Sequence, residues 1–195
     1  MDNNSGQSQG KLVVITGPSG VGKGTIIKRL LAKHPHFFLS ISATTRNPRQ
    51  GEVNGRDYYF LSRQEFETLI RQSQFLEWAE YNGNYYGTPC QPVKEQIAKG
   101  KTVILEIEVQ GARQVKKTFP SAVRIFIMPP SLEELERRLR QRGTDSEDSI
   151  TKRLQQAKTE LAASGEFDYQ IVNAQLEDTI SQIEAIILKH RYSPC

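Results

Sequence analysis

The sequence has few of the residue types that build disulfide frameworks, metal clusters or membrane spans. It contains two cysteines, Cys90 and Cys195, too few for a disulfide framework or a metal set. The three histidines lack ligand-like spacing with acids or cysteines, and no apolar run is long enough to span a bilayer. These absences favour a reducing, cytoplasmic setting without a membrane partner, and they predict no dedicated protein metal site.

The first ten residues also lack the apolar segment of a signal peptide. They are polar and rich in Asn, Gln, Ser and Gly, so we expect residues 1–10 to form a disordered tail. The remaining length suits one domain with an inserted subdomain. A content of 37% hydrophobic and 25% charged residues is typical of an ordinary globular protein.

Net positive charge is the compositional feature that bears on partners. The formal charge of +4 and the pI near 9.1 invite a nucleic-acid hypothesis. Much of the basic excess, however, lies in Arg137, Arg138, Arg140, Arg142, Lys152 and Arg153. No aromatic-interleaved basic stripe or recognition-helix pattern accompanies these residues. We therefore expect them to meet nucleotide phosphates and expect no nucleic-acid partner.

A glycine-rich stretch lies between an apolar, β-rich run at residues 12–15 and a helix-like segment at residues 26–31. It consists of Gly17, Pro18, Ser19, Gly20, Val21, Gly22, Lys23, Gly24 and Thr25. Strand, glycine loop and helix in this order are the context of a phosphate-binding loop, whose glycines let successive backbone N–H groups face one anion. The helix N-terminus adds free donors, and Lys23 adds a mobile charge for the outer phosphates.

This stretch departs from the usual motif at one position. A Ser or Thr that binds magnesium normally follows the lysine directly, but here Gly24 does so and Thr25 stands one place later. The usual magnesium-binding hydroxyl is therefore missing from the position directly after the lysine.

Strand-like and helix-like segments alternate on both sides of a polar, turn-rich region. Strand candidates at residues 37–42, 102–109, 122–128 and 169–172 alternate with helices. This pattern predicts an α/β fold with a parallel sheet and helices on both faces. The region from about residue 40 to residue 86 interrupts it and predicts a small, mostly β insertion.

Short sequence signals predict where several elements begin and turn. The segments at 62–65 and 131–134 are capping boxes that open helices. The Asn-Gly pair at 82–83 predicts a two-residue hairpin turn. The next helix is predicted to begin with Thr88 as its N-cap and Pro89 as its first residue.

Two pairs of charged side chains outside the loop are candidates for the chemistry. Arg46 and Arg49 lie on either side of a proline, where two guanidinium groups can grip one phosphate; the alternative is a pair of solvated arginines. Glu106 and Glu108 alternate with apolar residues in the 102–109 strand, so we expect both on one face near its carboxyl end. There they can hold Mg²⁺ waters or accept from a substrate; the alternative is a charged edge strand.

A third set of arginines follows in the region of high positive charge. Arg138 and Arg142 form an i,i+4 pair on one helix face, and a second helix after the break at Gly143 carries Arg153. This arrangement is typical of a lid that closes over a transferring phosphate, because phosphoryl transfer needs charge neutralisation and exclusion of water. The alternative is a pair of solvated helices whose arginines pair with neighbouring glutamates.

Four motifs together resemble those of the guanylate kinase family. They are the phosphate loop at 17–23, Ser-Ile-Ser-Ala-Thr-Thr-Arg-Asn-Pro-Arg-Gln-Gly-Glu at 40–52, Gly-Asn-Tyr-Tyr-Gly at 83–87 and Arg-Gln-Arg-Gly-Thr-Asp-Ser-Glu at 140–147. They occur in the family's order, and the resemblance covers about residues 11–191. It implies transfer of the γ-phosphate of ATP to GMP or dGMP, giving ADP and the guanosine diphosphate, with Mg²⁺.

The resemblance also implies a division of the chain and a role for each candidate. The core would be residues 11–39, 88–130 and 155–191, with a GMP-binding subdomain at about 40–87 and a lid at about 131–154. Guanine would contact Ser42, Glu77 and Thr88, with Glu108 close by. The GMP phosphate would be held by Arg46, Arg49, Tyr58 and Tyr86. The ATP phosphates and the transition state would meet Arg138, Arg142 and Arg153, and Asn173 would lie near adenine.

The chemistry of guanine agrees with the place given to Glu77. Guanine presents N1–H and N2–H₂ side by side, and one carboxylate accepts from both. Adenine lacks this donor pair and would leave the carboxylate unpaired, which discriminates by about 10⁴-fold or more.

The chain departs from the family's pattern in its acidic pair. The family usually carries Asp-x-Asp where this chain has Glu106-Ile107-Glu108, so the charge is kept but moved by one methylene. The second departure is Gly24, which suggests that magnesium is held mainly by the nucleotide phosphates and water.

Two other functions are weighed against an active guanylate kinase. One is a guanylate kinase-like module that binds partner proteins without turnover, and the presence of Lys23, Arg142 and Arg153 argues against it. The other is a kinase for a different nucleoside monophosphate, and the set of Ser42, Glu77 and Tyr86 argues against that. The oligomeric state does not follow from the sequence.

Overall fold

The computed structural model describes residues 10–81, 83–141, 143 and 146–189. The predicted tail before Gly10 and the candidate Arg142 lie outside the described residues. None of the helices in the described part of the chain is long and apolar enough to cross a membrane.

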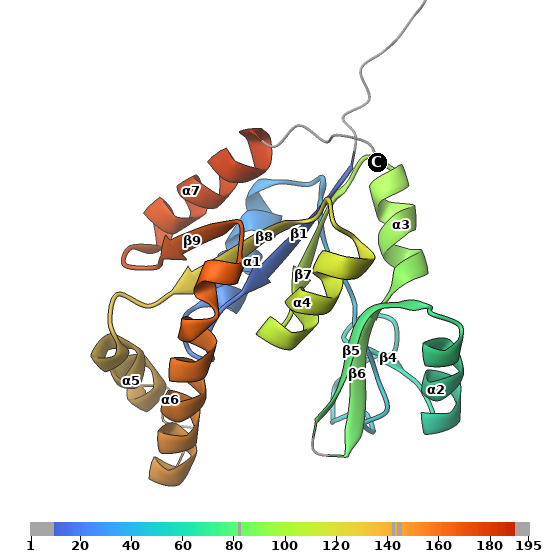
Figure 1. Cartoon of the computed structure of the whole chain (residues 1–195), viewed down its shortest axis with the longest axis horizontal. Coiled ribbons are helices and arrows are strands. Elements are labelled where there is room, and N and C mark those ends of the chain that lie inside the picture. Colours follow the sequence, from blue (N-terminus) through green and yellow to red (C-terminus); the bar gives the residue numbers. More distant parts are fainter. Residues whose placement is uncertain (1–9, 82, 142, 144–145, 190–195) are drawn as a thin grey trace, which may run out of the picture.

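A parallel sheet of five strands forms the centre of the fold (Figure 1). Its order is β2-β7-β1-β8-β9, and its strands are β1 (Lys11–Thr16), β2 (Phe37–Leu39), β7 (Thr102–Glu106), β8 (Val123–Met128) and β9 (Tyr169–Val172). The predicted α/β fold is confirmed. Ile15 of β1 lies opposite Glu106 on one side and Ile125 on the other. The glycine loop after β1 therefore leaves the sheet between the ends of two neighbouring strands.

Both faces of this sheet are covered by helices because residues 12–15 of β1 are all apolar and point alternately to the two faces. Val13 and Ile15 enter one buried cluster, while Leu12 and Val14 enter another. The first cluster includes buried residues of α1 (Lys23–Lys33), α5 (Leu132–Gln141), α6 (Glu147–Ala162) and α7 (Leu176–Lys189). The second includes buried residues of α3 (Cys90–Ala98) and α4 (Val109–Thr118). A short 3₁₀ turn, η1 (Ser164–Glu166), joins α6 to β9.

The predicted β insertion forms a second sheet with a core of its own. Its order is β4-β3-β6-β5, and its strands are β3 (Ala43–Thr44), β4 (Tyr59–Phe60), β5 (Phe75–Tyr81) and β6 (Asn84–Pro89). Helix α2 (Arg63–Arg71) packs Phe66 against Phe75 and Ala43. The rings of Phe66 and Phe75 stack with centroids 4.3 Å apart. The insertion thus has a small core of its own, while Leu76 of β5 packs into the second cluster of the main sheet.

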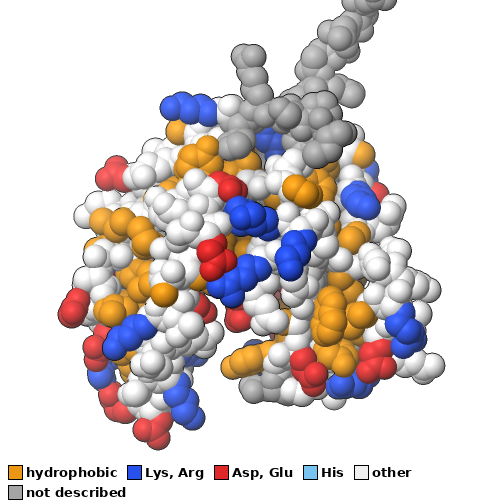
Figure 2. Space-filling view, in the orientation of Figure 1, with side chains coloured by type: hydrophobic (Ala, Val, Ile, Leu, Met, Phe, Trp, Pro, Cys, Tyr) orange, Lys and Arg blue, Asp and Glu red, His pale blue; other side chains and the backbone are white. Residues whose placement is uncertain are grey.

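Two arms extend from the main sheet toward the same side of the molecule. Figure 1 shows α5 and α6 forming one arm and the second sheet with α2 forming the other. The space-filling view of Figure 2 shows a hollow between these arms. The residues expected to bind nucleotides are therefore carried on both sides of a recess.

The predicted strands at 37–42 and 102–109 are too long. β2 ends at Leu39, because the chain then leaves β7 for the second sheet, which it joins at Ala43. β7 ends at Glu106, because α4 begins at Val109 with Glu108 as its N-cap. The apolar residue Val109, which continues the alternation beyond Glu106, belongs to α4 and packs into the same cluster as Val103 and Leu105 of β7.

The predicted start of α3 is also wrong. Pro89 has extended φ and ψ values of −62° and 135° and is the N-cap, so Cys90 is the first helical residue. Thr88 belongs to β6, and its hydroxyl donates to the Glu77 carboxylate over 2.6 Å. The Thr88 side chain, which the local pattern predicts as the cap of α3, therefore bonds to a residue of the neighbouring strand β5 instead.

The other local signals agree better with the structure. The capping box at Ser62 is complete, and Tyr81 pairs with Asn84 across the predicted two-residue turn. At Ser131 the hydroxyl accepts from the N–H of Glu134 over 3.1 Å, but the Glu134 carboxylate binds Arg137 and Arg138. The Glu134 carboxylate thus bonds to the two arginines instead of to the backbone N–H of Ser131, which would complete the capping box.

Candidate active site

The loop between β1 and α1 needs glycine where it touches the rest of the fold. Gly17 and Gly22 have φ values of 152° and 108°, which other residues rarely adopt. A Cβ on Gly17 would lie 2.3 Å from the carbonyl oxygen of Ile127, and one on Gly22 would lie 2.7 Å from Asn173 Nδ2. The loop is therefore packed against β8 and against the segment after β9 as closely as its backbone allows.

The start of α1 presents an uncompensated positive end. Gly22 is the N-cap, no side chain caps it, and the first turn carries no acidic residue. The exposed Gly24 and Thr25 contribute N–H groups that lack intrahelical partners, at the positive end of the helix dipole. Lys23 Nζ donates to the carbonyl oxygens of Gly17 and of Pro18, the latter over 3.2 Å. Donors and charge converge here as a polyphosphate requires.

Asn173 fixes the back of this loop. Its amide donates to the carbonyl oxygen of Val21 over 2.8 Å and accepts from the Thr179 hydroxyl over 3.0 Å. The residue is only 7% exposed. Because both ends of the amide bond to protein, Asn173 ties the loop to α7. Its predicted contact with adenine stays a prediction.

Arg138 and Arg153 reach the loop from the two helices of the α5–α6 arm. Arg138 donates to the carbonyl oxygens of Asn173 and Val21 over 2.9 and 3.3 Å, while its Nε donates to Glu134 over 2.8 Å. Hydrogen bonds from Arg137 and Arg138 lower the pKa of the Glu134 carboxyl to about 2. Arg153 Nη1 donates to Ser19 Oγ over 2.8 Å. Two of the three predicted lid arginines thus lie at the loop.

A cavity of about 370 Å³ lies between the second sheet and the main sheet. Its lining includes six predicted residues: Ser42, Tyr58, Glu77, Tyr86, Glu106 and Glu108. They come from segments that are up to 66 positions apart in the sequence (from 42 to 108). A cavity of this size with a few convergent polar groups is typical of a small-molecule site.

Glu77 is the buried acid of this cavity, with 7% of its surface exposed. Burial raises the pKa of its carboxyl, and the nearby negative charge of Glu108 raises it further, while hydrogen bonds involving Thr88 act in the opposite direction. Thr88 is itself buried and donates to Glu77 Oε1. A buried carboxylate needs donors, so this arrangement favours a ligand that presents N–H groups.

Glu106 and Glu108 also reach the cavity, by a route that differs from the prediction. Glu106 ends β7, and Glu108 is the N-cap of α4. Both residues are exposed. The predicted pair is thus brought to the cavity mouth by the strand-to-helix turn.

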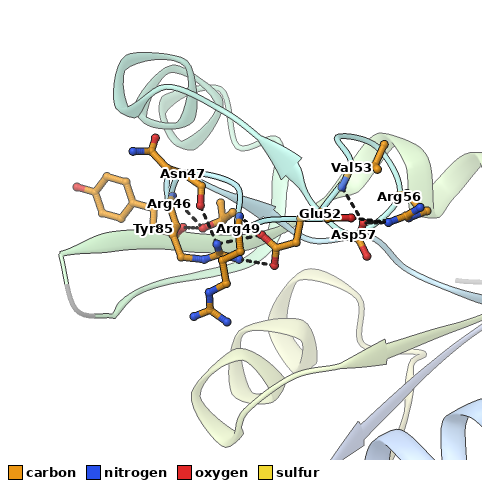
Figure 3. Close-up of polar contacts among 10 residues, drawn as sticks. Arg46, Asn47, Arg49, Glu52, Val53, Arg56, Asp57 and Tyr85 are labelled. Carbon is orange, nitrogen blue, oxygen red and sulfur yellow. Dashed lines mark hydrogen bonds and ion pairs between the residues drawn. The ribbon is translucent and has the colours of Figure 1, made fainter.

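Arg46 and Arg49 lie in a polar loop that is organised by one carboxylate (Figure 3). The Arg46 guanidinium donates to both oxygens of Glu52 over 2.9 and 3.0 Å, and the backbone N–H of Arg49 donates to Glu52 over 2.7 Å. These bonds, led by that from Arg46, lower the pKa of Glu52. The Arg46 guanidinium also lies 5.4 Å from the centre of the Tyr58 ring. Arg46 therefore stands beside the cavity that Tyr58 lines.

Comparison with known proteins bears on what this pair of sites is for. The family model described as guanylate kinase matches residues 9–190. The chain belongs to the guanylate kinase family.

Individual relatives agree with this membership. Guanylate kinases from Synechocystis sp. and Synechococcus elongatus are 64% and 60% identical over 179 and 180 residues, which is 92% of this chain in each case and 94% and 98% of the relatives. The crystal structure of guanylate kinase from Anaplasma phagocytophilum has a TM-score of 0.73 at 34% identity, covering 96% of this chain and 89% of that one. Shikimate kinase from Bacteroides thetaiotaomicron, with a TM-score of 0.50 at 14% identity over 91% of this chain and 98% of that one, shares the fold alone.

In this guanylate kinase family member, sequence reasoning missed two supporting residues. Glu52 orders the polar loop that carries Arg46 and Arg49. In the sequence it appears only as the last residue of a family motif. Gly111 of α4 lines the cavity and adjoins Glu77, and nothing in its sequence context marks it. The pattern of charges reveals groups that face a ligand but not the groups that hold them in place.

Proposed function

We propose that this chain catalyses the guanylate kinase reaction, with GMP in the cavity at Glu77 and ATP on the phosphate loop. The γ-phosphate of ATP passes to GMP, or to dGMP, and leaves ADP and the guanosine diphosphate. The observation that carries the proposal is the buried Glu77 carboxylate in a cavity of small-molecule size. Its demand for donors matches the N1–H and N2–H₂ of guanine, and the names of the relatives agree.

The base and the phosphate of GMP occupy opposite ends of the same cavity in this proposal. Ser42 and Thr88 assist Glu77 at the base end. Tyr58 and Tyr86 line the phosphate end, where the Arg46 guanidinium lies over the Tyr58 ring. Glu52 orients Arg46 through two hydrogen bonds, so the cation is positioned before a phosphate arrives, and Arg49 adds a second charge from the same loop.

ATP lies with its phosphates on the loop at residues 17–25. The orphan N–H groups of α1 and the Lys23 ammonium face the β- and γ-phosphates. Arg153, held by Ser19, and Arg138 add charge from the α5–α6 arm, and Arg142 belongs to the same proposed set. These groups neutralise charge on the transferring phosphoryl group and position it, which is the main catalytic task in phosphoryl transfer.

Mg²⁺ fits the oxygen donors present, provided that most of its ligands come from nucleotide and water. Among the described residues, no group of three or more His, Cys, Asp or Glu side chains could hold a metal ion. The exposed Thr25 hydroxyl and the exposed carboxylates of Glu106 and Glu108 are oxygen donors near the two sites. Bound Mg²⁺ would supply charge neutralisation on the phosphates.

The location and the division of the chain are also part of the proposal. A cytoplasmic setting agrees with the low cysteine content, and the partners are small molecules. The core, the GMP-binding subdomain and the lid keep the boundaries expected from the resemblance.

A coupled assay of ADP production with GMP, dGMP, AMP, UMP and CMP tests the activity. We expect turnover with GMP and dGMP only. Turnover with AMP but not GMP would overturn the assignment of the base site. Binding of GMP without turnover of any acceptor would instead favour the protein-binding module.

Glu77→Gln tests the residue that carries the proposal. An amide cannot accept from both guanine donors, so we expect the KM for GMP to rise about ten- to a hundredfold while the KM for ATP stays unchanged. Because the pKa of Glu77 is raised in the fold, its ionised form destabilises the fold above that pKa. The melting temperature of the variant at neutral pH should therefore equal or exceed that of the wild type.

Glu80→Gln is the matched control, because Glu80 is exposed on the same strand. It should leave both KM values unchanged. An unchanged KM for GMP in Glu77→Gln would remove Glu77 from the base site.

A further inference from the structure

Helix α4 pairs with the strand that carries Glu77. β5 is an edge strand of the second sheet, so one side of its backbone has no strand partner in that sheet. Gln114 of α4 accepts from the N–H of Trp78 over 3.1 Å and donates to the carbonyl oxygen of Trp78 over 2.8 Å. Thr118 donates to the carbonyl oxygen of Leu76 over 2.7 Å. The strand is thus bonded to α4 on both sides of Glu77.

Gly111 lies one turn before Gln114 on the same face of α4. The spacing of residues 111, 114 and 118 places all three along one stripe of the helix. Gly111 is buried and lines the cavity. The contacts between α4 and β5 therefore continue to the first turn of α4, where Gly111 adjoins the Glu77 side chain of β5.

A side chain at position 111 would meet the Glu77 carboxylate. A Cβ on Gly111 would lie 2.8 Å from Glu77 Oε2, 3.2 Å from its Cδ and 3.4 Å from its Cγ, and these are its three nearest atoms. Real Cβ atoms essentially never approach an oxygen at 2.8 Å, so the carboxylate would have to move. The other carboxylate oxygen is bonded to Thr88, so a shift would disturb that hydrogen bond as well.

The backbone does not require glycine at this position. Gly111 is within α4 and is not among the residues with positive φ. Alanine has the higher helix propensity and would fit the backbone without strain. What the position needs is the absence of a Cβ, and the need comes from Glu77.

We propose that Gly111 is a specificity-determining positioning residue. By lacking a side chain, it lets the Glu77 carboxylate lie against α4, at the place where it receives the N1–H and N2–H₂ of guanine. The proposal rests on the guanine site proposed above. It extends that site from the insertion to a helix of the core.

Gly111→Ala tests the proposal. We expect the KM for GMP to rise about tenfold or more, because one or both hydrogen bonds to a charged acceptor are lost. The KM for ATP should change by less than about twofold, because no residue of the phosphate loop, which the structure describes in full, lines the cavity that holds Glu77, and the melting temperature should not fall. Gly165→Ala is the control, since a Cβ there would meet no atom within 4 Å among the described residues.

A double-mutant cycle separates positioning from packing. In a Glu77→Ala background, Gly111→Ala should have no further effect on the KM for GMP, because there is no carboxylate left to displace. A full additional loss in that background would overturn the proposal. A lower melting temperature with equal rises in both KM values would also overturn it, because Gly111 would then serve packing in general.

The two proposals fail in different ways. If Glu77→Gln leaves the KM for GMP unchanged, the guanine site itself is wrong. If Glu77→Gln raises this KM and Gly111→Ala does not, only the role of Gly111 is overturned.

Discussion

The loop at residues 17–25 and the cavity at Glu77 are proposed to solve two recognition problems, and they do so in different ways. The loop is nine consecutive residues, and its binding groups are mainly backbone N–H groups set by glycine conformation and a helix start. The cavity is lined by side chains from separate strands and helices, with a buried carboxylate at one end. A phosphate is a symmetric anion that a local backbone motif can bind, whereas a base must be distinguished by donors and acceptors at defined places.

The largest expected effect concerns the loop. Lys23→Ala removes the charge proposed to face the outer phosphates and should lower kcat about 10²- to 10³-fold or more, as loss of a transition-state contact does. Steady-state kinetics with saturating GMP and ATP measure it. Lys28→Ala, an exposed lysine of the same helix, is the control and should leave kcat unchanged. Near-normal turnover of a folded Lys23→Ala protein would contradict the role of the loop.

A pH series sharpens the comparison from the side of the cavity. Burial, and then the charge of Glu108, raise the pKa of Glu77 above its ordinary value of 4.5. Acidification therefore protonates Glu77 at a higher pH than it would an exposed glutamate, and a protonated carboxyl loses one of its two acceptors. The KM for GMP of Glu77→Gln divided by that of the wild type should be largest at about pH 8 and should fall on acidification.

This ratio is the quantity to measure because titration of the GMP phosphate affects both proteins and cancels. A ratio that stays constant through the acid range would show that the charge of Glu77 does not control GMP binding. Binding of ATP at the loop should not depend on the charge of Glu77. The KM for ATP of Glu77→Gln divided by that of the wild type should therefore stay near unity at every pH.

The smallest expected effect concerns the unusual residue of the loop. A Cβ on Gly24 would meet no atom within 4 Å among the described residues, so Gly24→Ser should fold normally. Its hydroxyl would restore a Mg²⁺ ligand at the usual position, and the Mg²⁺ concentration for half-maximal rate should fall a few-fold, on the order of one added hydrogen bond or ligand contact. Gly24→Ala, measured in the same titration, should match the wild type. An equal shift in both variants would exclude a role for the hydroxyl.

Local sequence signals predicted the elements well where one interaction dominates. The capping box at Ser62, the hairpin turn between Tyr81 and Asn84 and the strand at 169–172 are all confirmed. The prediction was wrong where a distant partner took over. Thr88 bonds to Glu77 instead of capping a helix, and β2 ends at Leu39 because the chain then crosses to pair with β6 of the second sheet.

The same distinction separates the site residues that could be predicted from those that could not. Charged and aromatic side chains such as Arg46, Glu77 and Tyr86 stand out in the sequence, because their types suit phosphate and guanine. Glu52 and Gly111 do not, because their roles consist of holding Arg46 and leaving room for Glu77. Such roles depend on neighbours that only folding brings together.

By itself, the sequence determined the α/β class, the phosphate loop and the family, because these depend on periodicity and on consecutive residues. The tertiary structure alone decided that Glu77 is buried beside Thr88 and Gly111, that Asn173 bonds to the back of the loop, and which groups the predicted lid residues Arg138 and Arg153 bond there. The physical reason is range. Hydrogen bonding and burial between segments far apart in the chain are set by how sheets and helices pack, and no local pattern encodes them.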